Sequence, residues 1–187
     1  MSDIKRFFSY PGMKLFKIYK ILYSLSLYPI YKVLFRKFGI FTYISPSASL
    51  VNKLSMSIGR NVIVNRCCTI WTTDLYLGDF VQINPGSVIY GKIKIGKNVL
   101  IGPNCNIVGG NHRFEDLSKP IRTQGSNSVG IEIGDDVWLG AAVSIVDGVK
   151  IGSGSIIGAG SVLTKNIPRN SIVVGNPGKV IRTRGRS

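Results

Sequence analysis

Aliphatic residues recur every six positions through most of this 187-residue chain, and this period constrains the fold more than any other feature. The pattern forms three ladders: Ile58, Val64 and Ile70; then Leu77, Ile83, Ile89, Ile95, Ile101 and Ile107; then Ile133, Leu139, Ile145, Ile151, Ile157 and Leu163. Neither the α-helical period of about 3.6 nor the two-residue alternation of a strand produces a strict six. A short strand followed by a tight corner does, and three such sides close a coil of about eighteen residues. The ladders therefore predict a parallel β-helix from about Ile44 almost to the last residue.

The position four residues after each ladder residue is usually small or β-branched, and we expect it to point into the core. Cys68 and Cys105 occupy this position, which predicts buried thiols, whereas Cys67 falls one position earlier and nearer a corner. The predicted corners carry Gly, Asn and Asp, which tolerate the backbone angles of tight turns. Examples are Gly59-Arg60-Asn61, Gly78-Asp79, Gly96-Lys97-Asn98 and Gly134-Asp135-Asp136.

Residues 1–41 lack the six-residue period and are predicted to be a basic amphipathic helical segment, set apart from the β-helix domain of residues 42–187. An apolar stripe recurs there at helical spacing, formed by Leu15, Ile18, Leu22 and Leu25. We expect Pro29 to break or kink this helix, with a second short helical piece ending near Gly39. The longest charge-free stretch, residues 21–31, is too short to span a bilayer, which needs about 20 apolar residues.

Charge in this N-terminal segment leaves two roles open. It holds eight Lys or Arg residues against Asp3, which is +7 of the chain's formal net charge of +15. Such a segment suits the surface of an anionic membrane. It equally suits a cap over the open end of the β-helix, which repeat folds need. Peripheral contact with the membrane and a capping role are therefore both expectations.

The ladder breaks twice. One residue is added between Ile70 and Leu77, and a much longer departure, residues 109–131, separates Ile107 from Ile133. A loop extruded from a regular scaffold is a common place for function. This loop contains His112, the single histidine of the sequence.

Composition excludes several classes of protein. Three cysteines without a CxxC pair, and no secretory signal, predict a reduced, cytoplasmic setting. A site built on several imidazoles is excluded by the single histidine, and no metal is expected. The basic charge permits nucleic-acid binding, but no aromatics interleave with basic residues in the repeats, so we expect no nucleic-acid partner.

Several motifs together resemble the hexapeptide-repeat acetyltransferases over about residues 44–184. They are the [LIV]-G-x-x-[small]-x repeat, the His112 loop, Val137-Trp138-Leu139-Gly140, Gly158-Ala159-Gly160-Ser161-Val162-Leu163-Thr164-Lys165, and Gly175-Asn176-Pro177-Gly178-Lys179-Val180-Ile181-Arg182. The loop beginning Asn111-His112-Arg113 is similar to that of bacterial polysaccharide O-acetyltransferases. Maltose and galactoside acetyltransferases carry His-Pro where this chain has His112-Arg113. The resemblance implies a left-handed parallel β-helix and a homotrimer with active sites between subunits.

The resemblance also implies roles for residues of the reaction. His112 is the expected general base, because activating a hydroxyl against a thioester needs a group with a pKa near 7. Asn84 is expected to bind the acceptor sugar, with a purely structural corner amide as the alternative. Trp138 would wall the active site or fill the trimer interface. Backbone N–H groups at Gly140 and Ala141 would stabilise the oxyanion.

For the cosubstrate, acetyl-CoA, the resemblance implies a groove lined by Ala159, Thr164 and Lys165, with Arg182 near the nucleotide. Basic residues of the C-terminal tail suit a polyphosphate, and a solvated basic terminus is the alternative. They are Lys179, Arg182, Arg184 and Arg186. Glu115 or Asp116 could orient the imidazole of His112.

The function expected from these motifs is transfer of an acetyl group from acetyl-CoA to a sugar hydroxyl of a bacterial surface glycan. Transfer would be direct, in a ternary complex. N-acylation of an amino sugar uses the same fold and is the nearest alternative. A nucleic-acid-binding β-helix and a purely structural repeat protein are alternatives from other classes. The cytoplasm is the expected location, with contact at the inner face of the membrane left open by residues 1–41.

Overall fold

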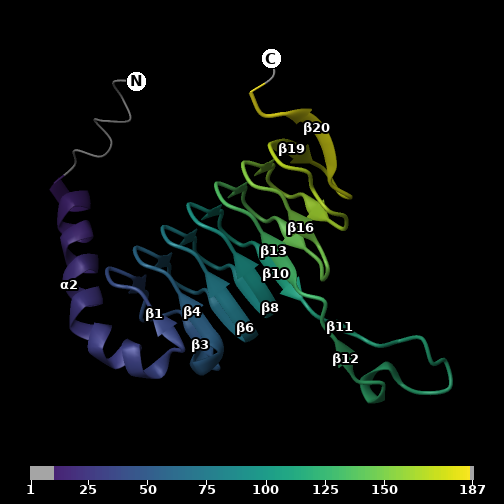
Figure 1. The fold of residues 1–187 in the computed structure, drawn as a ribbon, viewed down its shortest axis with the longest axis horizontal. Coiled ribbons are helices and arrows are strands. Elements are labelled where there is room, and N and C mark those ends of the chain that lie inside the picture. Colours follow the sequence, from purple (N-terminus) through teal and green to yellow (C-terminus); the bar gives the residue numbers. More distant parts are fainter. Residues whose placement is uncertain (1–10, 186–187) are drawn as a thin grey trace.

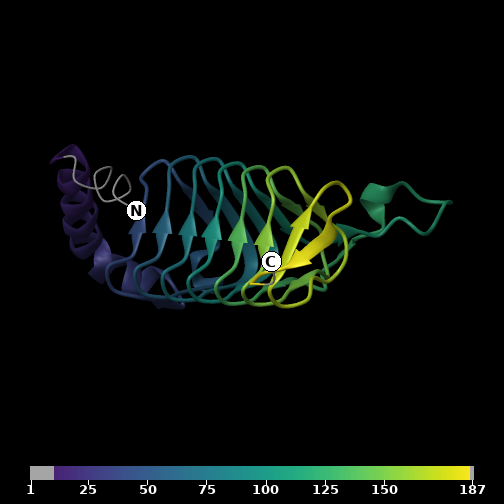
Figure 2. The same ribbon diagram turned by 90° about the horizontal axis from the view of Figure 1, so that it is seen from above.

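The computed structural model describes residues 11–185 as a β-helix with one α-helix across its N-terminal end (Figures 1 and 2). Short strands from successive coils stack in parallel and form three sides of a prism. This confirms the parallel β-helix and the N-terminal helix that the ladders and the helical spacing predict. The corners are numbered by the sides they join: corner 1 joins sides 1 and 2, corner 2 joins sides 2 and 3, and corner 3 joins side 3 to the next coil.

Two long strands bend round corner 2 and contribute to two sides each, namely β6 (Thr69–Leu77) and β8 (Val88–Ile95). Side 1 contains β2 (Tyr43–Ile44), β5 (Ile63–Val64), β7 (Gln82–Ile83), β9 (Leu100–Ile101), β14 (Trp138–Leu139), β17 (Ile156–Ile157) and β19 (Ser171–Val174). Side 2 contains β3 (Ser49–Val51), the first halves of β6 and β8, β10 (Asn106–Gly109), β15 (Ser144–Ile145) and β18 (Val162–Leu163). Side 3 contains β1 (Lys37–Phe38), β4 (Met56–Ile58), the second halves of β6 and β8, β13 (Ile131–Ile133) and β16 (Lys150–Ile151).

The predicted ladders are the core of the β-helix. Every ladder residue is buried, with at most 3% of its surface exposed. Ladder residues of successive coils pair in register, as Ile83 does with Ile101 and Ile107 does with Ile145. Full burial of one such side chain contributes about 1.5–3 kcal/mol, so the repeated column supplies most of the driving force for stacking. Cys68 and Cys105 are buried as predicted, and burial raises the pKa of both thiols.

Corner 3 shows why the repeat needs glycine and asparagine. A Cβ added to Gly78 would lie 2.6 Å from the carbonyl oxygen of Gly96 in the next coil, and one on Gly59 would lie 2.7 Å from the backbone of Gly78. Two residues later the backbone turns through positive φ, with Asn61 at 54° and Asn98 at 57°. Side chains other than Gly and Asn rarely adopt this region without strain. The close approach of the next coil therefore requires the glycine, whereas the positive φ favours Asn but is also adopted by Phe41 and Phe80, both at 60°.

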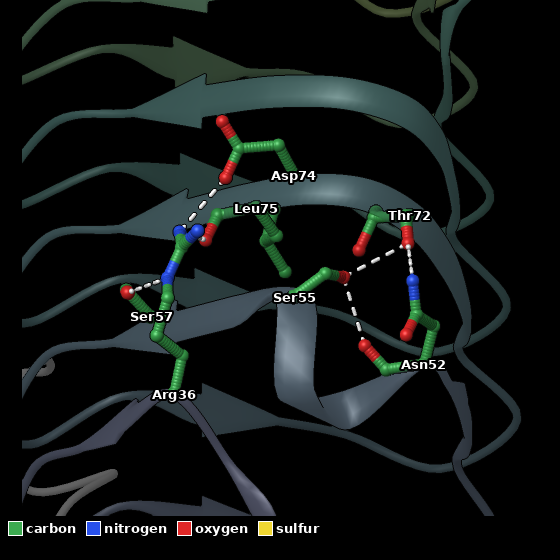
Figure 3. Close-up of polar contacts among 7 residues, drawn as sticks. All are labelled: Arg36, Asn52, Ser55, Ser57, Thr72, Asp74 and Leu75. Carbon is green, nitrogen blue, oxygen red and sulfur yellow. Dashed lines mark hydrogen bonds and ion pairs between the residues drawn. The ribbon is translucent and has the colours of Figure 1, made fainter.

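The extra residue before Leu77 is accommodated as a β-bulge at corner 2, where the register between β6 and β8 shifts between Thr72 and Asp74. The bulge turns the Thr72 carbonyl away from the regular ladder. Asn52 Nδ2 and Ser55 Oγ donate to that oxygen at 3.1 and 2.9 Å (Figure 3). Ser55 belongs to a short 3-10 turn, η1 (Lys53–Ser55), in the preceding coil.

The bulge also anchors the chain that follows the N-terminal helix. Arg36 donates to Ser57 Oγ and to Asp74 Oδ1, both at 2.8 Å (Figure 3). Three segments far apart in sequence are thereby joined at one corner. Because Arg36 and Asp74 are each about half exposed, the ion pair positions the chain more than it stabilises the fold.

The N-terminal helix, α2, spans Pro11–Leu34 and is continuous through Pro29, although its direction changes along its length (Figure 1). The predicted second helical piece ending near Gly39 is wrong, because the helix ends at Leu34 and Lys37 begins β1, the first rung of side 3. The predicted division at residue 41 thus falls inside the first coil. Whether residues 1–41 act as a separate unit stays a prediction.

One face of α2 covers the first coil. Tyr28 and Tyr31 pack against Phe38, with ring centroids 6.4 and 5.0 Å apart, and Ser24 is buried beneath the helix. This is the contact that a cap requires. Within residues 11–185 the structure has no helix of the length and apolar character that crossing a bilayer demands.

At the opposite end, the chain folds back on itself. β20 (Lys179–Thr183) pairs antiparallel with β19, the last strand of side 1. The free hydrogen-bonding edge of that side is therefore covered by the chain's own C-terminal segment.

Candidate active site

The loop predicted to be extruded forms a long arm that projects from corner 2 (Figures 1 and 2). After β10 the chain forms a small antiparallel hairpin from β11 (Asn111–His112) and β12 (Ser126–Asn127), with a 3-10 turn, η2 (Ile121–Thr123), beyond it. Every residue from 111 to 129 is exposed or half-buried. The arm therefore contributes almost nothing to the core.

The base of the arm is nevertheless fixed to the coils. The carboxylate of Asp147 accepts hydrogen bonds from the backbone N–H groups of Val129 and Gly130 at 2.9 and 2.7 Å. Ser128 Oγ donates to the carbonyl of Gly109 at 2.6 Å. The entry and exit strands of the arm are thus held together, and His112 lies directly beyond this clamp.

His112 lines a cavity of about 280 Å³ between the arm and side 2. Its opposite wall is formed by Trp71 of β6 and Tyr90 of β8, whose rings meet edge to face with centroids 6.0 Å apart. Both rings are about half exposed, and the bulged residue Thr73 lies beside them. The arrangement places an imidazole opposite an apolar wall, with hydroxyl and amide groups around it.

Trp71 and Tyr90 were not among the residues predicted from the sequence. Each directly follows a ladder residue, Ile70 or Ile89, so each had to point outward from side 2. Two large outward aromatics stacked next to the only added residue in the ladder were a signal that could have identified them.

The imidazole itself has no hydrogen bond or ion pair with any residue from 11 to 185 in this structure. Glu115 accepts from the N–H of Phe114, and Asp116 is occupied by Ser118 and Lys119. The expected orientation of His112 by one of these acids is therefore not present. Both ring nitrogens are left able to exchange a proton with a bound molecule.

Asn84 lies at corner 1, at the other end of side 2. Its Nδ2 donates to the carbonyl of Ile101 at 2.9 Å, and its Oδ1 accepts from Gln82 Nε2 at 2.9 Å. The amide thus joins two coils, which is the structural role weighed as an alternative for this residue. One N–H of the amide remains for a second partner, so its contact with a sugar stays a prediction.

The predicted oxyanion donors differ in availability. The N–H of Gly140 donates to the carbonyl of Ile157 at 2.8 Å and is committed to the stack of coils. The N–H of Ala142 donates to Pro103 at 2.8 Å. Between them, the N–H of Ala141 has no acceptor within the described part of the chain. The N–H of Gly140 is thus already paired, and among these three residues only Ala141 has an N–H left for a ligand; its role at an oxyanion stays a prediction.

Trp138 lies on the outer surface of side 1. It is 51% exposed and is flanked in the stack by Leu100, which is 48% exposed, and by Ile156. This apolar strip borders corner 1, where Asn84 and Ala141 lie. Its position is compatible with both roles considered for Trp138.

The predicted cofactor residues lie at three places: corner 1, corner 2 and the C-terminal strand β20. Ala159 is exposed at corner 1, in the coil directly after Ala141. Thr164 and Lys165 are exposed at corner 2, two coils beyond the arm, or about 10 Å along the stack. Arg182 is exposed on β20, paired with Ile172.

The basic tail is only partly free. Arg184 forms an ion pair with Asp136 at 2.7 Å and also donates to the carbonyl of Gly154. It is thus tied to corner 3 and is not a free phosphate ligand. Arg186 lies outside the described residues.

One chain does not bring all these groups together. The four residues of β8 on side 2 separate corner 1 from corner 2 by roughly 13 Å at about 3.3 Å per residue. His112, Thr164 and Lys165 stand at corner 2, whereas Asn84, Ala141 and Ala159 stand at corner 1. A site that uses both groups needs corner 1 of one chain and corner 2 of another.

A larger cavity, of about 610 Å³, lies on side 3 and is lined by residues that include Glu132 and Lys150. These two form an ion pair at 3.0 Å, which lowers the pKa of Glu132. No group suited to act as a base near neutral pH lines this cavity, so the chemistry is assigned to the His112 cavity. The described residues also contain no cluster of three potential metal ligands.

Comparison with known proteins supports the fold and its repeat. The family described as bacterial transferase hexapeptide (six repeats) matches residues 74–109 and 130–165, on either side of the arm. A protein of Mycobacterium tuberculosis named as a probable acetyltransferase is 38% identical over 133 residues, covering 69% of this chain and 44% of the relative. The chain spans about half the length of the curated relatives it matches, between 44 and 62% for the first of them.

Solved structures share the architecture. AntD, an N-acyltransferase from Bacillus cereus solved with dTDP and 3-hydroxybutyryl-CoA, superposes with a TM-score of 0.75 at 23% identity, covering 85% of this chain and 88% of that one. A maltose O-acetyltransferase from Clostridium difficile gives a TM-score of 0.61 at 24% identity, covering 91% and 89%. At this level of identity the likeness concerns the fold. The repeat match, the curated relatives and the shared architecture agree that the chain carries the repeats of the bacterial transferase hexapeptide family.

Proposed function

We propose that this protein transfers an acetyl group from acetyl-CoA to a hydroxyl of a sugar in a bacterial surface glycan, with His112 as the general base. The observation that carries the proposal is the cavity that the only imidazole of the chain lines together with the rings of Trp71 and Tyr90. Exposed aromatic rings offer a flat apolar surface to the C–H face of a sugar, while the imidazole accepts a hydroxyl proton.

The proposed reaction is direct. His112 takes the proton of the acceptor hydroxyl as its oxygen attacks the thioester carbonyl. The N–H of Ala141 donates to the oxyanion of the tetrahedral intermediate. The C–S bond then breaks, and the imidazolium returns its proton to the sulfur of CoA. The imidazole is restored, and the enzyme carries no covalent intermediate.

The separation of corners 1 and 2 supports a homotrimer in which His112 of one chain meets Ala141 and Asn84 of its neighbour. The exposed strip of Leu100 and Trp138 along side 1 would be covered by that contact. Ala159, Thr164, Lys165 and Arg182 would then border the groove for the pantetheine and nucleotide. Because acetyl-CoA is a cytoplasmic metabolite, the reaction is proposed to occur on the cytoplasmic side of the membrane.

The test is release of CoA thiol from acetyl-CoA in the presence of paired sugars that differ only by a hydroxyl or an amine at one carbon. We expect His112→Ala to reduce kcat/KM by about 10²- to 10⁴-fold, the usual contribution of a general base. Leu117→Ala, on the exposed tip of the same arm, is the matched control and should keep wild-type activity. Unchanged activity in His112→Ala would end the proposal.

Mass spectrometry of the product separates the two acyl-transfer reactions. An ester on the hydroxyl sugar supports O-acetylation. An amide formed only on the amino sugar would replace the proposal with N-acylation, the activity named for AntD.

A further inference from the structure

The helix α2 has two apolar faces, and the coils use only one of them. The inner face, which includes Ser24, Tyr28 and Tyr31, packs on the first coil. The outer face is also apolar, and each of its large side chains is between 40 and 78% exposed. These outer residues are Leu15, Ile18, Leu22, Leu25 and Val33.

The spacing of the two faces shows that they oppose each other. At about 3.6 residues per turn, Leu22 and Ser24 lie some 200° apart around the helix axis. The apolar stripe identified in the sequence, for which a cap and a membrane surface were both expected roles, is therefore the outer one. A helix that is apolar all round normally has a partner on every side, and nothing among residues 11–185 covers this side.

Charge indicates what the partner is. From residue 4 to residue 73 the sequence contains eleven Lys or Arg residues and no Asp or Glu. The remaining 114 residues, from Asp74 on, contain thirteen basic and eight acidic residues. The N-terminal part of the sequence is thus strongly basic, with Arg36 and Arg60 paired to Asp74 and Asp79 of the following coil, whereas the rest is mixed. Two copies of such an end would repel each other, which disfavours self-association through this face.

We infer that the outer face of α2 lies on an anionic bilayer, parallel to its surface. Leu15, Ile18, Leu22 and Val33 would enter the boundary between headgroups and acyl chains, and the surrounding basic residues would meet lipid phosphates. Measured along the helix axis, the stripe from Leu15 to Val33 covers about 27 Å at 1.5 Å per residue, and the axis changes direction on the way (Figure 1). Lys32, exposed beside Val33, can lay its alkyl chain along the interface and keep its ammonium group in water.

The orientation of the molecule follows from Figures 1 and 2. α2 lies across the end of the β-helix, and the arm projects at a distance from it. Docking through the outer face of α2 would involve residues that are separate from those lining the His112 cavity. The inference is independent of the chemistry of that cavity, because none of the outer residues of α2 lines it.

The test is co-sedimentation of the full chain with vesicles of phosphatidylcholine alone and of phosphatidylcholine mixed with phosphatidylglycerol. We expect at least about tenfold stronger partition onto the anionic vesicles at low ionic strength, with binding that weakens as salt is added. The triple variant Ile18→Gln, Leu22→Gln, Val33→Gln should lose more than about tenfold of that partition. Its circular dichroism should not change, because the three side chains make no core contact.

The matched control removes three exposed apolar side chains from the arm instead: Leu117→Gln, Ile121→Gln and Val129→Gln. This variant should bind vesicles like the wild type. Equal partition onto both vesicle types, or equal partition of the α2 variant and the wild type, overturns the inference. Failure of the wild type to bind vesicles, together with a lower oligomer mass for the α2 variant in light scattering, would instead assign the face to contacts between copies.

Discussion

The coils and the arm obey different physical rules, although one chain forms both. In the coils each residue is fixed by its neighbours above and below, and the ladder side chains are at most 3% exposed. In the arm no residue from 111 to 129 is buried, and the contacts are local turns such as the bonds between Gln124 and the backbone of Asp116 and Lys119. Stability therefore resides in the coils, while His112, the proposed general base, stands on the arm. Changes in the arm should therefore leave the stability of the fold intact while they reduce the proposed activity.

The largest expected effect comes from removing the arm. Deleting residues 110–129 joins Gly109 to Gly130 and Ile131, which reproduces the connection Gly91-Lys92-Ile93 of the preceding coil. Activity should fall by at least about 10²- to 10⁴-fold because the base is lost. The free energy of unfolding should change by no more than about 1 kcal/mol, since a long surface loop costs little. Thermal unfolding and the thiol-release assay measure the two quantities, and unfolding of the deletion variant would show that the arm supports the coils.

Creating one cavity in the coils should lower the stability and leave the activity unchanged, which is the opposite of deleting the arm. Ile101→Ala removes a fully buried side chain between Ile83 and Leu139, and the free energy of unfolding should fall by about 2–5 kcal/mol. Activity per folded molecule should be retained at low temperature. Leu117→Ala, on the arm, should change stability by less than about 0.5 kcal/mol. Similar losses for the two variants in urea titrations would contradict the division between coils and arm.

Trp71 tests the border between the two regions, because it belongs to a coil but faces the cavity of the arm. Trp71→Ala should raise KM for the acceptor sugar roughly tenfold, as expected when a stacked ring is lost. KM for acetyl-CoA and the melting temperature should change little, because the ring is about half exposed. If KM rises instead for acetyl-CoA, the aromatic wall belongs to the cosubstrate site.

The smallest expected effect depends on pH. Asp79 accepts the backbone N–H of Arg60 in the neighbouring coil at 3.0 Å, and this bond, together with the Arg60 guanidinium, lowers the pKa of the carboxyl. A lowered pKa in the folded state gives stability that is present above the unfolded value, near 3.8, and is lost as the pH falls through the folded value. Asp79→Asn should therefore cost less than about 1 kcal/mol at pH 7, and the difference should shrink at an acid pH below 3.8.

The arm supplies the control for that experiment. The pKa of Asp116 is also lowered, first by its bond with Lys119, but the pair is confined to the arm. Asp116→Asn should leave global unfolding unchanged at both pH values. A pH-dependent loss of stability in Asp116→Asn would couple the arm to the core.

The sequence predicted the coils well because their period is imposed by geometry at every repeat. Burial of Ile83 or Leu163 follows from the spacing alone, and so does the position of the arm, since the ladder simply stops at Ile107 and resumes at Ile133. The spacing could not show, however, that the N–H of Gly140 is already paired while that of Ala141 is not. Which of two adjacent N–H groups is free depends on pairing with Ile157 in the next coil, and this pairing is a property of the stack.

The N-terminal helix was predicted from its spacing, but the face that meets the coils was not. Leu15, Ile18, Leu22 and Leu25 have the correct helical spacing, but the aromatic residues at Tyr28 and Tyr31 form a second apolar stripe on the opposite face. Periodicity cannot decide which of two stripes meets the core. In the structure the stripe with the tyrosines meets the core, where Tyr28 and Tyr31 pack against Phe38 at the open end of the first coil.

The antiparallel return of β20 onto β19 has a consequence for how this chain behaves in concentrated solution. A bare rung presents a row of unpaired N–H and C=O groups, and an identical rung of another molecule is its natural complement. With Lys179 to Thr183 laid along that row in the reverse direction, a second prism finds no template on side 1 for end-to-end growth. A short reversed strand thus works against filament formation at this end of the stack, where the edge of side 1 would otherwise be open.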